Sequence, residues 1–202
     1  MKRLVILISG RGSNMAALLE ASASGELPVF PAAVISSSSD AGGLRIAGAL
    51  GVETRVVDHA SFDCRAAFDE ALAGTIDDFS PDLVILAGFM WILGDEFVRH
   101  YAGRLVNIHP SLLPAFPGRD THRRALAEGV RFHGCTAHFV TPDLDRGPII
   151  AQAVVPVFDS DDETSLASRV LEEEHKLLPR VVRWFAEGRL RMVGGRVCVD
   201  VD

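Results

Sequence analysis

The stretch "LVILISGRGSNMAALLEASASG" (residues 4–25) reads as a buried strand, a glycine-containing turn and a helix. Its first residues form a continuous apolar run, which is typical of a strand covered on both faces. The next apolar residues recur at helical spacing, and Gly25 is typical of a helix end. Because a buried strand followed by a helix is the repeating unit of parallel α/β sheets, this stretch predicts the fold class.

The rest of the chain repeats this alternation of apolar strands and helices. Strands are expected at residues 32–37, 52–57, 82–88, 104–109, 134–140 and 149–157, and helices at 43–51, 63–79, 121–129 and 163–187. A small hairpin turned at Gly194 and Gly195 is expected to follow. The sequence predicts an open, mostly parallel twisted sheet with helices on both faces, Rossmann-like, with antiparallel additions toward the C-terminus.

Length and composition predict a single globular domain over residues 1–202. The chain is 48% hydrophobic and 23% charged, and no apolar run approaches the roughly 20 residues that a membrane helix needs. We therefore expect no membrane partner. The N-terminal "MKRLVILIS" is short for a signal peptide and has no small-residue cleavage site, which predicts a cytoplasmic location.

Charge and cysteine content exclude several classes of function. The net charge is −7 and no basic stripe is present, so we expect no nucleic-acid partner. Cys64, Cys135 and Cys198 are far apart and lack any C-x-x-C spacing, which argues against a disulfide framework or a thiolate metal site. His133 and His138 lack a third ligand at recognisable spacing, so no metal is expected.

The loop "ISGRGSNM" (residues 8–15) joins the first strand to the first helix. In sheets of this class, ligands bind at the carboxyl ends of the strands. Free amides at Gly12, Ser13 and Asn14 would attract an anion, although a tight turn with Ser13 as N-cap explains the same residues. Met15 stands where a dinucleotide fingerprint needs a third glycine, so the loop favours one phosphate over a pyrophosphate.

The stretch "LVNIHPSLLPAFPG" (residues 105–118) ends a strand with two polar side chains. Asn107 and His109 are two residues apart, so they face the same side of the strand. Pro110 disfavours the helical region for His109, and two further prolines stiffen the loop. An asparagine amide beside a histidine suits a carbonyl whose oxygen becomes negative during attack. No residue here is a convincing nucleophile for a covalent mechanism.

A histidine in such a role needs a group that orients it, and "VTPDLDRGPII" (residues 140–150) offers two aspartates. Spacing does not choose between Asp143 and Asp145. Both aspartates would equally well fix a turn through local backbone bonds.

Five segments together resemble phosphoribosylglycinamide formyltransferases, the folate-dependent enzymes of purine synthesis. They are "ILISGRGSN", "PDLVILAGFMWIL", "GRLVNIHPSLLPAFPG", "HFVTPDLDRGPII" and "EEEHKLLPRVVRWFAEGRL". The resemblance covers about residues 3–192. It implies transfer of a formyl group from 10-formyltetrahydrofolate to the amine of glycinamide ribonucleotide (GAR), and it is compatible with a homodimer.

The resemblance also assigns site residues and halves of the domain. It implies a phosphate- and ribonucleotide-binding half (1–100), a folate-binding and catalytic half (101–192) and a tail or hairpin (193–202). The implied catalytic residues are Asn107, His109 and Asp145, and those for GAR are Gly12, Ser13, Asn14 and Glu174. The implied folate residues are Arg65, Met90, Trp91, Ile92, Leu93, Asn107, Thr141, Pro142, Asp143, Leu144 and Asp145.

Three positions depart from the family pattern. Trp91 stands where bacterial members have arginine, Ala115 replaces a lysine, and Arg119-Asp120 replaces a less charged pair. The binding of the folate glutamate tail therefore does not carry over. Arg119 restoring the charge and Trp91 stacking on the benzoyl ring are two alternatives.

Rival interpretations come from related and unrelated classes. Formyltetrahydrofolate deformylase and the formyltransferases that act on tRNA or sugar nucleotides share the Asn–His–Asp core. The tRNA enzyme and the deformylase normally carry a further domain for which 202 residues leave no room. A non-catalytic nucleotide-binding module would explain the glycine loop but leave the Asn–His–Asp set unused.

Overall fold

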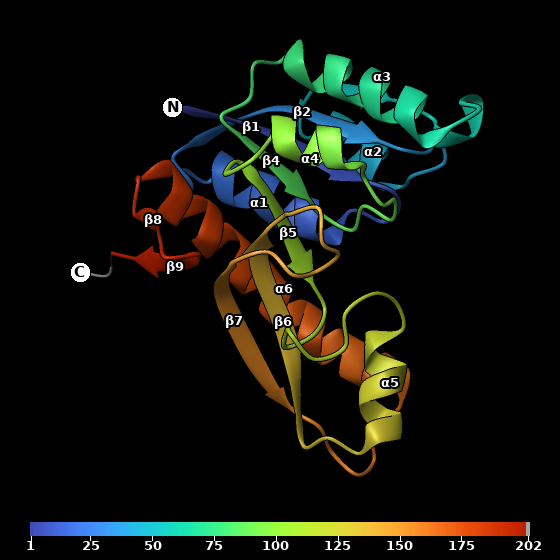
Figure 1. Cartoon of the computed structure of the whole chain (residues 1–202), viewed down its shortest axis with the longest axis vertical. Helices are drawn as coiled ribbons and strands as arrows, with labels where there is room; N and C mark the ends of the chain where they lie inside the picture. The colour runs from blue at the N-terminus through green and yellow to red at the C-terminus, as the bar shows by residue number, and fades with distance from the viewer. Residues whose placement is uncertain (201–202) are drawn as a thin grey trace. The chain divides into compact units, whose positions relative to one another are not determined.

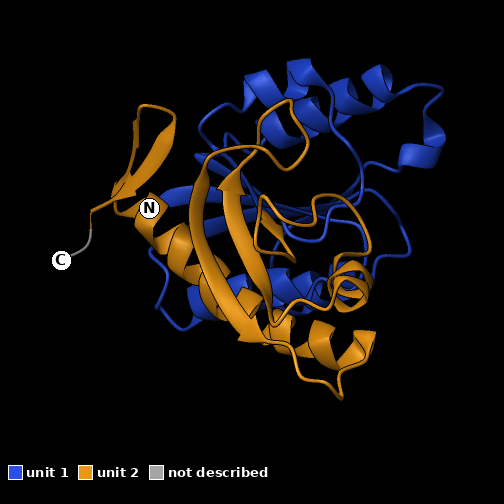
Figure 2. Cartoon of the chain, turned by 60° about the horizontal axis from the view of Figure 1, so that its bottom comes forward, with its two compact units in different colours: residues 1–107 blue, residues 108–202 orange. Residues whose placement is uncertain are grey.

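The computed structural model describes residues 1–200 and divides into two compact units, Met1–Asn107 and Ile108–Asp202 (Figure 2). Whether they act as one formyltransferase domain stays a prediction. Residues 201 and 202 of the predicted tail lie outside the described residues. The elements of unit 1 are β1 (Lys2–Ile8), α1 (Ser13–Ala23), β2 (Val29–Ser36), α2 (Gly43–Ala49), β3 (Thr54–Val56), the 3₁₀-helix η1 (His59–Ser61), α3 (Arg65–Asp77), β4 (Leu83–Leu86), α4 (Asp95–His100) and most of β5 (Leu105–His109).

Unit 2 contains the end of β5 and the remaining elements. These are α5 (Thr121–Glu128), β6 (Phe132–Phe139), β7 (Ile149–Pro156), α6 (Glu163–Ala186), β8 (Leu190–Val193) and β9 (Arg196–Val199). The predicted sheet is confirmed: its strand order is β3-β2-β1-β4-β5-β6-β7. The strands of unit 1 pair in parallel, whereas β6–β7 and the hairpin β8–β9 are antiparallel.

Unit 1 has helices on both faces of its strands. Figure 1 shows α1 and α3 on opposite sides of the strands, α1 contacts α2, and α3 contacts α4. Successive strands are added toward one edge of the sheet from β1 to β3 and toward the other edge from β4 to β5. Because the crossovers are right-handed, the helices of these two series cover opposite faces. The strands are therefore covered on both sides, which explains why residues 4–8 of β1 are all buried.

The direction of winding reverses between β1 and β4, which are neighbours in the sheet. Such a switch point opens a crevice at the carboxyl ends of the two strands. Here the backbone amide of Ser9, after β1, donates to the carbonyl of Gly88, after β4, at 3.2 Å. The glycine loop and the loop of residues 88–94 therefore start side by side in unit 1.

Unit 2 is built on one long amphipathic helix that packs against β6 and β7. Helix α6 begins with a capping box, in which Asp162 accepts from the Ser165 amide and the Ser165 hydroxyl accepts from the Asp162 amide. Its buried residues form one stripe at helical spacing: Leu166, Val170, Glu174, Leu177, Leu178, Val181 and Val182. Seven consecutive residues of β6 are buried, whereas exposed and covered residues mostly alternate along the edge strand β7.

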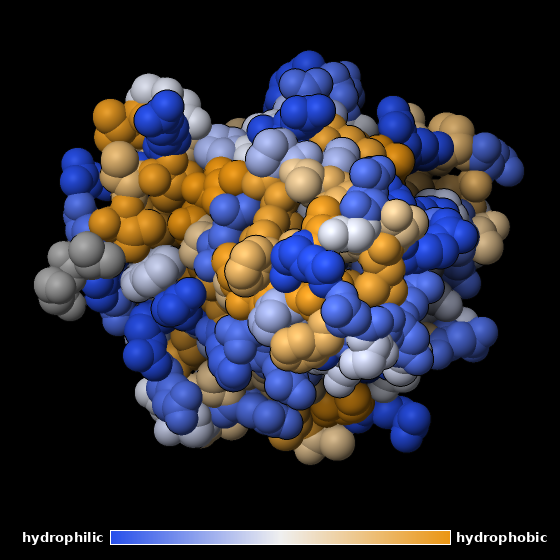
Figure 3. All heavy atoms as spheres, turned by 90° about the horizontal axis from the view of Figure 1, so that it is seen from below, coloured by the Kyte–Doolittle hydropathy of each residue, from blue (hydrophilic) through white to orange (hydrophobic). Residues whose placement is uncertain are grey.

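The surface in Figure 3 shows hydrophilic and hydrophobic residues intermixed on one face of the molecule. Among its exposed apolar side chains, the chain presents Met192 and Val193 on β8 and Val154 on β7. Within residues 1–200, no helix combines the length and the apolar character needed to cross a membrane.

Two local features differ from the sequence-based expectation. Helix α4 was not predicted, because six residues are too few to show a helical period, although acidic residues begin it and basic residues end it. The N-cap of α1 is Gly12 rather than Ser13, and no side chain caps this helix. The alternative of a Ser13 cap is therefore wrong.

Gly134 of β6 lies so close to β7 that an added Cβ would collide with the Ala153 carbonyl oxygen and lie 2.9 Å from Leu112. We expect Gly134→Ala to lower the free energy of unfolding by about 1–3 kcal/mol, because backbone cannot give way as a flexible side chain can. Urea denaturation measures the change. Gly48→Ala in α2 is the control; it has open space and should stabilise by about 0.5–1 kcal/mol. Equal effects of the two substitutions would contradict the packing described.

Candidate active site

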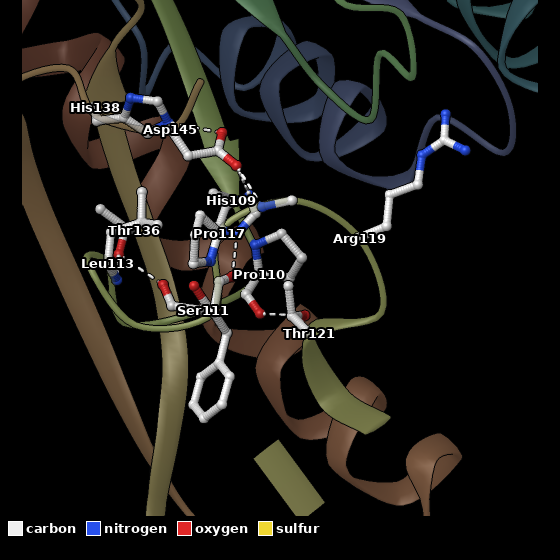
Figure 4. Close-up of polar contacts among 12 residues, drawn as sticks. His109, Pro110, Ser111, Leu113, Pro117, Arg119, Thr121, Thr136, His138 and Asp145 are labelled. Atoms are coloured by element: carbon white, nitrogen blue, oxygen red, sulfur yellow. Dashed lines mark hydrogen bonds and ion pairs between the residues drawn. The ribbon is translucent and has the colours of Figure 1, made fainter. Parts of the chain in front are cut away.

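His109 ends strand β5 and is buried, with 6% of its surface exposed. Its Nε2 lies 3.0 Å from the carbonyl oxygen of Phe116, and its Nδ1 lies 3.5 Å from Oδ2 of Asp145 (Figure 4). Both ring nitrogens thus face oxygen atoms that accept hydrogen bonds. A hydrogen on Nε2 points toward the carbonyl, and a hydrogen on Nδ1 would point toward the carboxylate. The structure brings these two predicted catalytic residues together.

Asp145 occupies the loop between β6 and β7 and has a backbone φ of 52°. A non-glycine residue in this left-handed region is uncommon and clusters at functional sites. The Gly118 amide donates to Asp145 Oδ2 at 2.8 Å. Residues 116–118 therefore hold both partners, with a carbonyl on His109 and an amide on Asp145.

His138 is the second histidine near this carboxylate, with Nε2 3.9 Å from Oδ1 of Asp145. Its Nδ1 lies 2.9 Å from the Phe139 carbonyl, which can only accept, so this nitrogen carries the proton. Burial lowers the pKa of His138. His138 is therefore neutral near pH 7, and His109 is the closer imidazole to Asp145.

The proline loop after His109 is anchored by a buried threonine. Thr136 Oγ1 accepts from the Leu113 amide at 3.0 Å and donates to the Ser111 carbonyl at 2.6 Å. Gln152 lies opposite Thr136 on β7. Its Nε2 donates to Thr136 Oγ1 at 3.0 Å and to the Leu113 carbonyl at 2.9 Å. Sequence reasoning missed Thr136 and Gln152. Their only signal was a polar pair placed inside two strands of otherwise mostly apolar residues.

The far end of this loop is tied to the start of α5. Thr121 Oγ1 donates to the Pro110 carbonyl at 2.7 Å, and Arg124 donates to the Pro117 carbonyl. The Leu113–Pro114 peptide is cis. In Figure 4, the Arg119 side chain points away from the His109–Asp145 pair.

In unit 1, the glycine loop has the geometry that its residues predict. Gly12 has a φ of 75°, and an added Cβ would lie 2.9 Å from the Gly43 Cα. Only glycine meets both requirements. Ser13 and Asn14 then begin α1, so their amides belong to the first turn, where backbone N–H groups favour anions. The assignment of a phosphate to these amides stays a prediction.

The loop of residues 88–94 is fixed at both ends and turns its middle outward. The Met90 amide donates to Ser9 Oγ at 3.0 Å, and the Gly94 amide donates to Asp69 Oδ2 at 2.7 Å. Burial raises the pKa of Asp69, while the Gly94 amide and the nearby Arg65 oppose this. The side chains of Met90, Trp91 and Ile92 are nevertheless exposed, whereas that of Leu93 is buried.

The other predicted residues lie within the two units as follows. Asn107 is half-buried in β5 of unit 1, and residues 141–145 form the loop after β6 in unit 2. There the Thr141 hydroxyl donates to the Asp143 carbonyl at 3.3 Å, and Pro142 and Leu144 are exposed. Glu174 is buried on α6, and its charge adds to burial in raising the pKa of the Cys135 thiol to about 12. Within the described part of the chain, no three His, Cys, Asp or Glu side chains are grouped to hold a metal ion.

The fold and these residues define a class, an α/β enzyme with a histidine–aspartate pair at the carboxyl end of a sheet strand. The family model described as "Formyl transferase" matches residues 2–182, and the chain belongs to this family. It is 50% identical over 189 residues to phosphoribosylglycinamide formyltransferase of Escherichia coli K12, covering 94% of this chain and 89% of that protein.

Solved structures give the same likeness. The crystal structure of glycinamide ribonucleotide transformylase 1 from Symbiobacterium toebii superposes with a TM-score of 0.96 at 46% identity, covering 98% of this chain and 94% of that one. A formyltetrahydrofolate deformylase from Burkholderia mallei superposes with a TM-score of 0.90 at 32% identity, covering 99% of this chain and 70% of that one.

We expect Thr136→Val to destabilise the protein by about 1–3 kcal/mol, because the buried Leu113 amide loses its acceptor while the side-chain shape is kept. Urea denaturation measures the change in the free energy of unfolding. Thr75→Val in α3 removes only a hydroxyl bond to the Ala71 carbonyl within the helix and should stay within about 0.5 kcal/mol. If both substitutions have the same small effect, Thr136 does not anchor the loop.

His133 of β6 makes the stability depend on pH. Burial, helped by neighbouring His122, lowers its pKa from 6.5 to about 4. The unfolded state therefore binds more protons between these pH values, and stability should fall as pH decreases from about 6.5 to about 4, by at most about 1.4 kcal/mol per unit for this group. Urea denaturation across this range should give a flatter profile for His133→Asn. An unchanged slope in the variant would show that another group causes the acid loss.

Proposed function

We propose that this chain transfers a formyl group from 10-formyltetrahydrofolate to the amine of GAR, giving N-formyl-GAR and tetrahydrofolate. The formyltransferase activity in purine biosynthesis rests on the family match and on 50% identity to the Escherichia coli enzyme over most of both chains. The observation that supports the site is the buried His109–Asp145 pair, held by residues 116–118.

In the proposed reaction the GAR amine attacks the formyl carbon directly, without a covalent enzyme intermediate. The new C–N bond forms while the formyl oxygen becomes negative. Asn107, which cannot titrate, and protonated His109 donate hydrogen bonds to this oxygen. The bond between carbon and N10 of the folate then breaks, and the proton lost by the amine ends on that nitrogen.

Asp145 orients the imidazole and balances its charge, and it helps to move the proton from the amine to the departing folate nitrogen. In the structure the Phe116 carbonyl accepts from Nε2 of His109. Donation to the formyl oxygen therefore requires this bond to be exchanged or shared when substrates bind. Such a change of hydrogen-bond partner is compatible with catalysis, because catalytic hydrogen bonds often align only in the substrate complex.

The two substrates are assigned to different residue sets. The amides of Gly12, Ser13 and Asn14 would hold the single phosphate of GAR, and Glu174 its ribose. The folate would contact Arg65, Met90–Leu93, Asn107 and the loop 141–145, where backbone groups read the pterin. The same proposal includes a cytoplasmic location, uses no metal and allows a homodimer.

Incubation of the protein with 10-formyltetrahydrofolate, with and without GAR, tests the reaction. Release of tetrahydrofolate that depends on GAR is the expected result. Release without GAR would instead indicate deformylation, the activity named for the Burkholderia mallei structure. Absence of release in both arms would contradict either enzyme.

Substitution of His109 and, as a control, of His100 tests whether His109 acts in the reaction itself. We expect His109→Asn to lower kcat by about 10²–10³-fold, because the oxyanion loses a positively charged donor. His100→Asn on α4 is the control, since this side chain is exposed and pairs with Asp77 on the surface. Steady-state rates of formyl transfer at saturating substrates measure the effect. Full activity of His109→Asn would rule out the assigned role.

A further inference from the structure

Trp91 stacks against His59 in unit 1. The ring centroids are 3.6 Å apart and the planes are inclined by 32°. Trp91 belongs to the loop after β4, whereas His59 begins the short helix η1 after β3. The contact therefore joins two loops that sequence reasoning treated separately, and His59 was not among the predicted site residues.

Two linked serines hold the His59 ring and the backbone beside Trp91. His59 Nδ1 lies 3.1 Å from the Ser37 carbonyl, which can only accept, so Nδ1 carries a hydrogen. The Ser37 hydroxyl lies 2.7 Å from Ser9 Oγ, and that oxygen accepts from the Met90 amide at 3.0 Å. The stack is thus built on the ends of β1 and β2. Nε2 of His59 is the nitrogen left to gain or lose a proton.

The stack forms part of an exposed apolar surface at the switch point. Trp91 is 41% exposed, and its neighbours Met90 and Ile92 are 56% and 60% exposed. Three consecutive large apolar residues in solvent, anchored at both ends of their loop, suit a flat aromatic ligand. Arg65 lies beside the same loop, because an added Cβ at Gly94 would be 3.7 Å from its Nε.

We propose that His59 is a specificity-determining residue that binds a carboxylate in the glutamate part of formylfolate, while the open face of Trp91 takes the benzoyl ring. This inference rests on the proposed function, because it assumes that formylfolate is the co-substrate. His59 then supplies a positive charge beside Trp91, the residue that stands where the family pattern has arginine.

A histidine differs from an arginine because its charge changes between about pH 5 and 8. Asp58 is a charged group that faces the His59 ring, with Oδ1 3.7 Å from Nδ1, and Ser37 and Trp91 are uncharged neighbours. A protonated imidazole also gains from the indole face. Recognition of the glutamate carboxylates should therefore strengthen as pH falls.

Binding can be read from Trp91 itself. The chain has two tryptophans, so a Trp184→Phe background leaves Trp91 as the single fluorophore. The probes are a stable 5,8-dideaza analogue of formylfolate and the same analogue with both glutamate carboxylates converted to amides. The dissociation constants of both probes are measured at about pH 5.5 and about pH 8. The proteins compared are the Trp184→Phe background and the same background with His59→Gln, His59→Lys or, as the control, His100→Gln.

We expect the background protein and His100→Gln to prefer the carboxylate probe about threefold more strongly at the lower pH. His59→Gln should lose this pH dependence, and His59→Lys should keep the preference at both pH values. A His59→Gln protein whose preference changes with pH as in the background would overturn the inference but leave the proposed function intact. Failure of the background protein to bind either probe would overturn both.

Discussion

The hydrogen bonds that residues 116–118 make to His109 and Asp145 are the constraint on which the proposed catalytic residues of unit 2 depend. A backbone carbonyl takes one side of the imidazole, and a backbone amide takes the carboxylate that faces its other side. Both of these groups belong to the backbone, so these hydrogen bonds depend on the conformation of the loop and not on the identity of its side chains. The loop has a positive φ at Phe116 and at Gly118, and prolines at positions 110, 114 and 117 restrict the rest of its backbone.

The hydrogen bonds of residues 116–118 in turn depend on strands β6 and β7. Thr136 and Gln152 fix the middle of the proline loop, and the close approach of Gly134 to Ala153 sets the pairing that places them. In unit 1 the corresponding rigid frame is the switch point between β1 and β4. There Ser9 joins the glycine loop to the apolar loop of residues 88–94. Each unit thus places its share of the proposed site residues at strand ends.

The sequence predicted those features that local chemistry determines. The buried β1, the helical stripe of α6 and the Gly12 turn follow from periodicity and from the conformational needs of glycine. Spacing could not choose Asp145 over Asp143. The choice depends on a hydrogen bond to Asp145 from the Gly118 amide, which is 27 residues away in the chain. The His59–Trp91 stack was missed for the same reason, since no periodic signal joins residues on separate loops.

A crystal structure with a formylfolate analogue and GAR bound tests the central claim most directly. The account predicts the formyl oxygen within hydrogen-bonding distance of the Asn107 amide and His109 Nε2, with Asp145 still facing Nδ1. It also predicts the GAR phosphate on the amides of residues 12–14. A formyl group bound away from His109, or an imidazole that no longer faces Asp145, would contradict it.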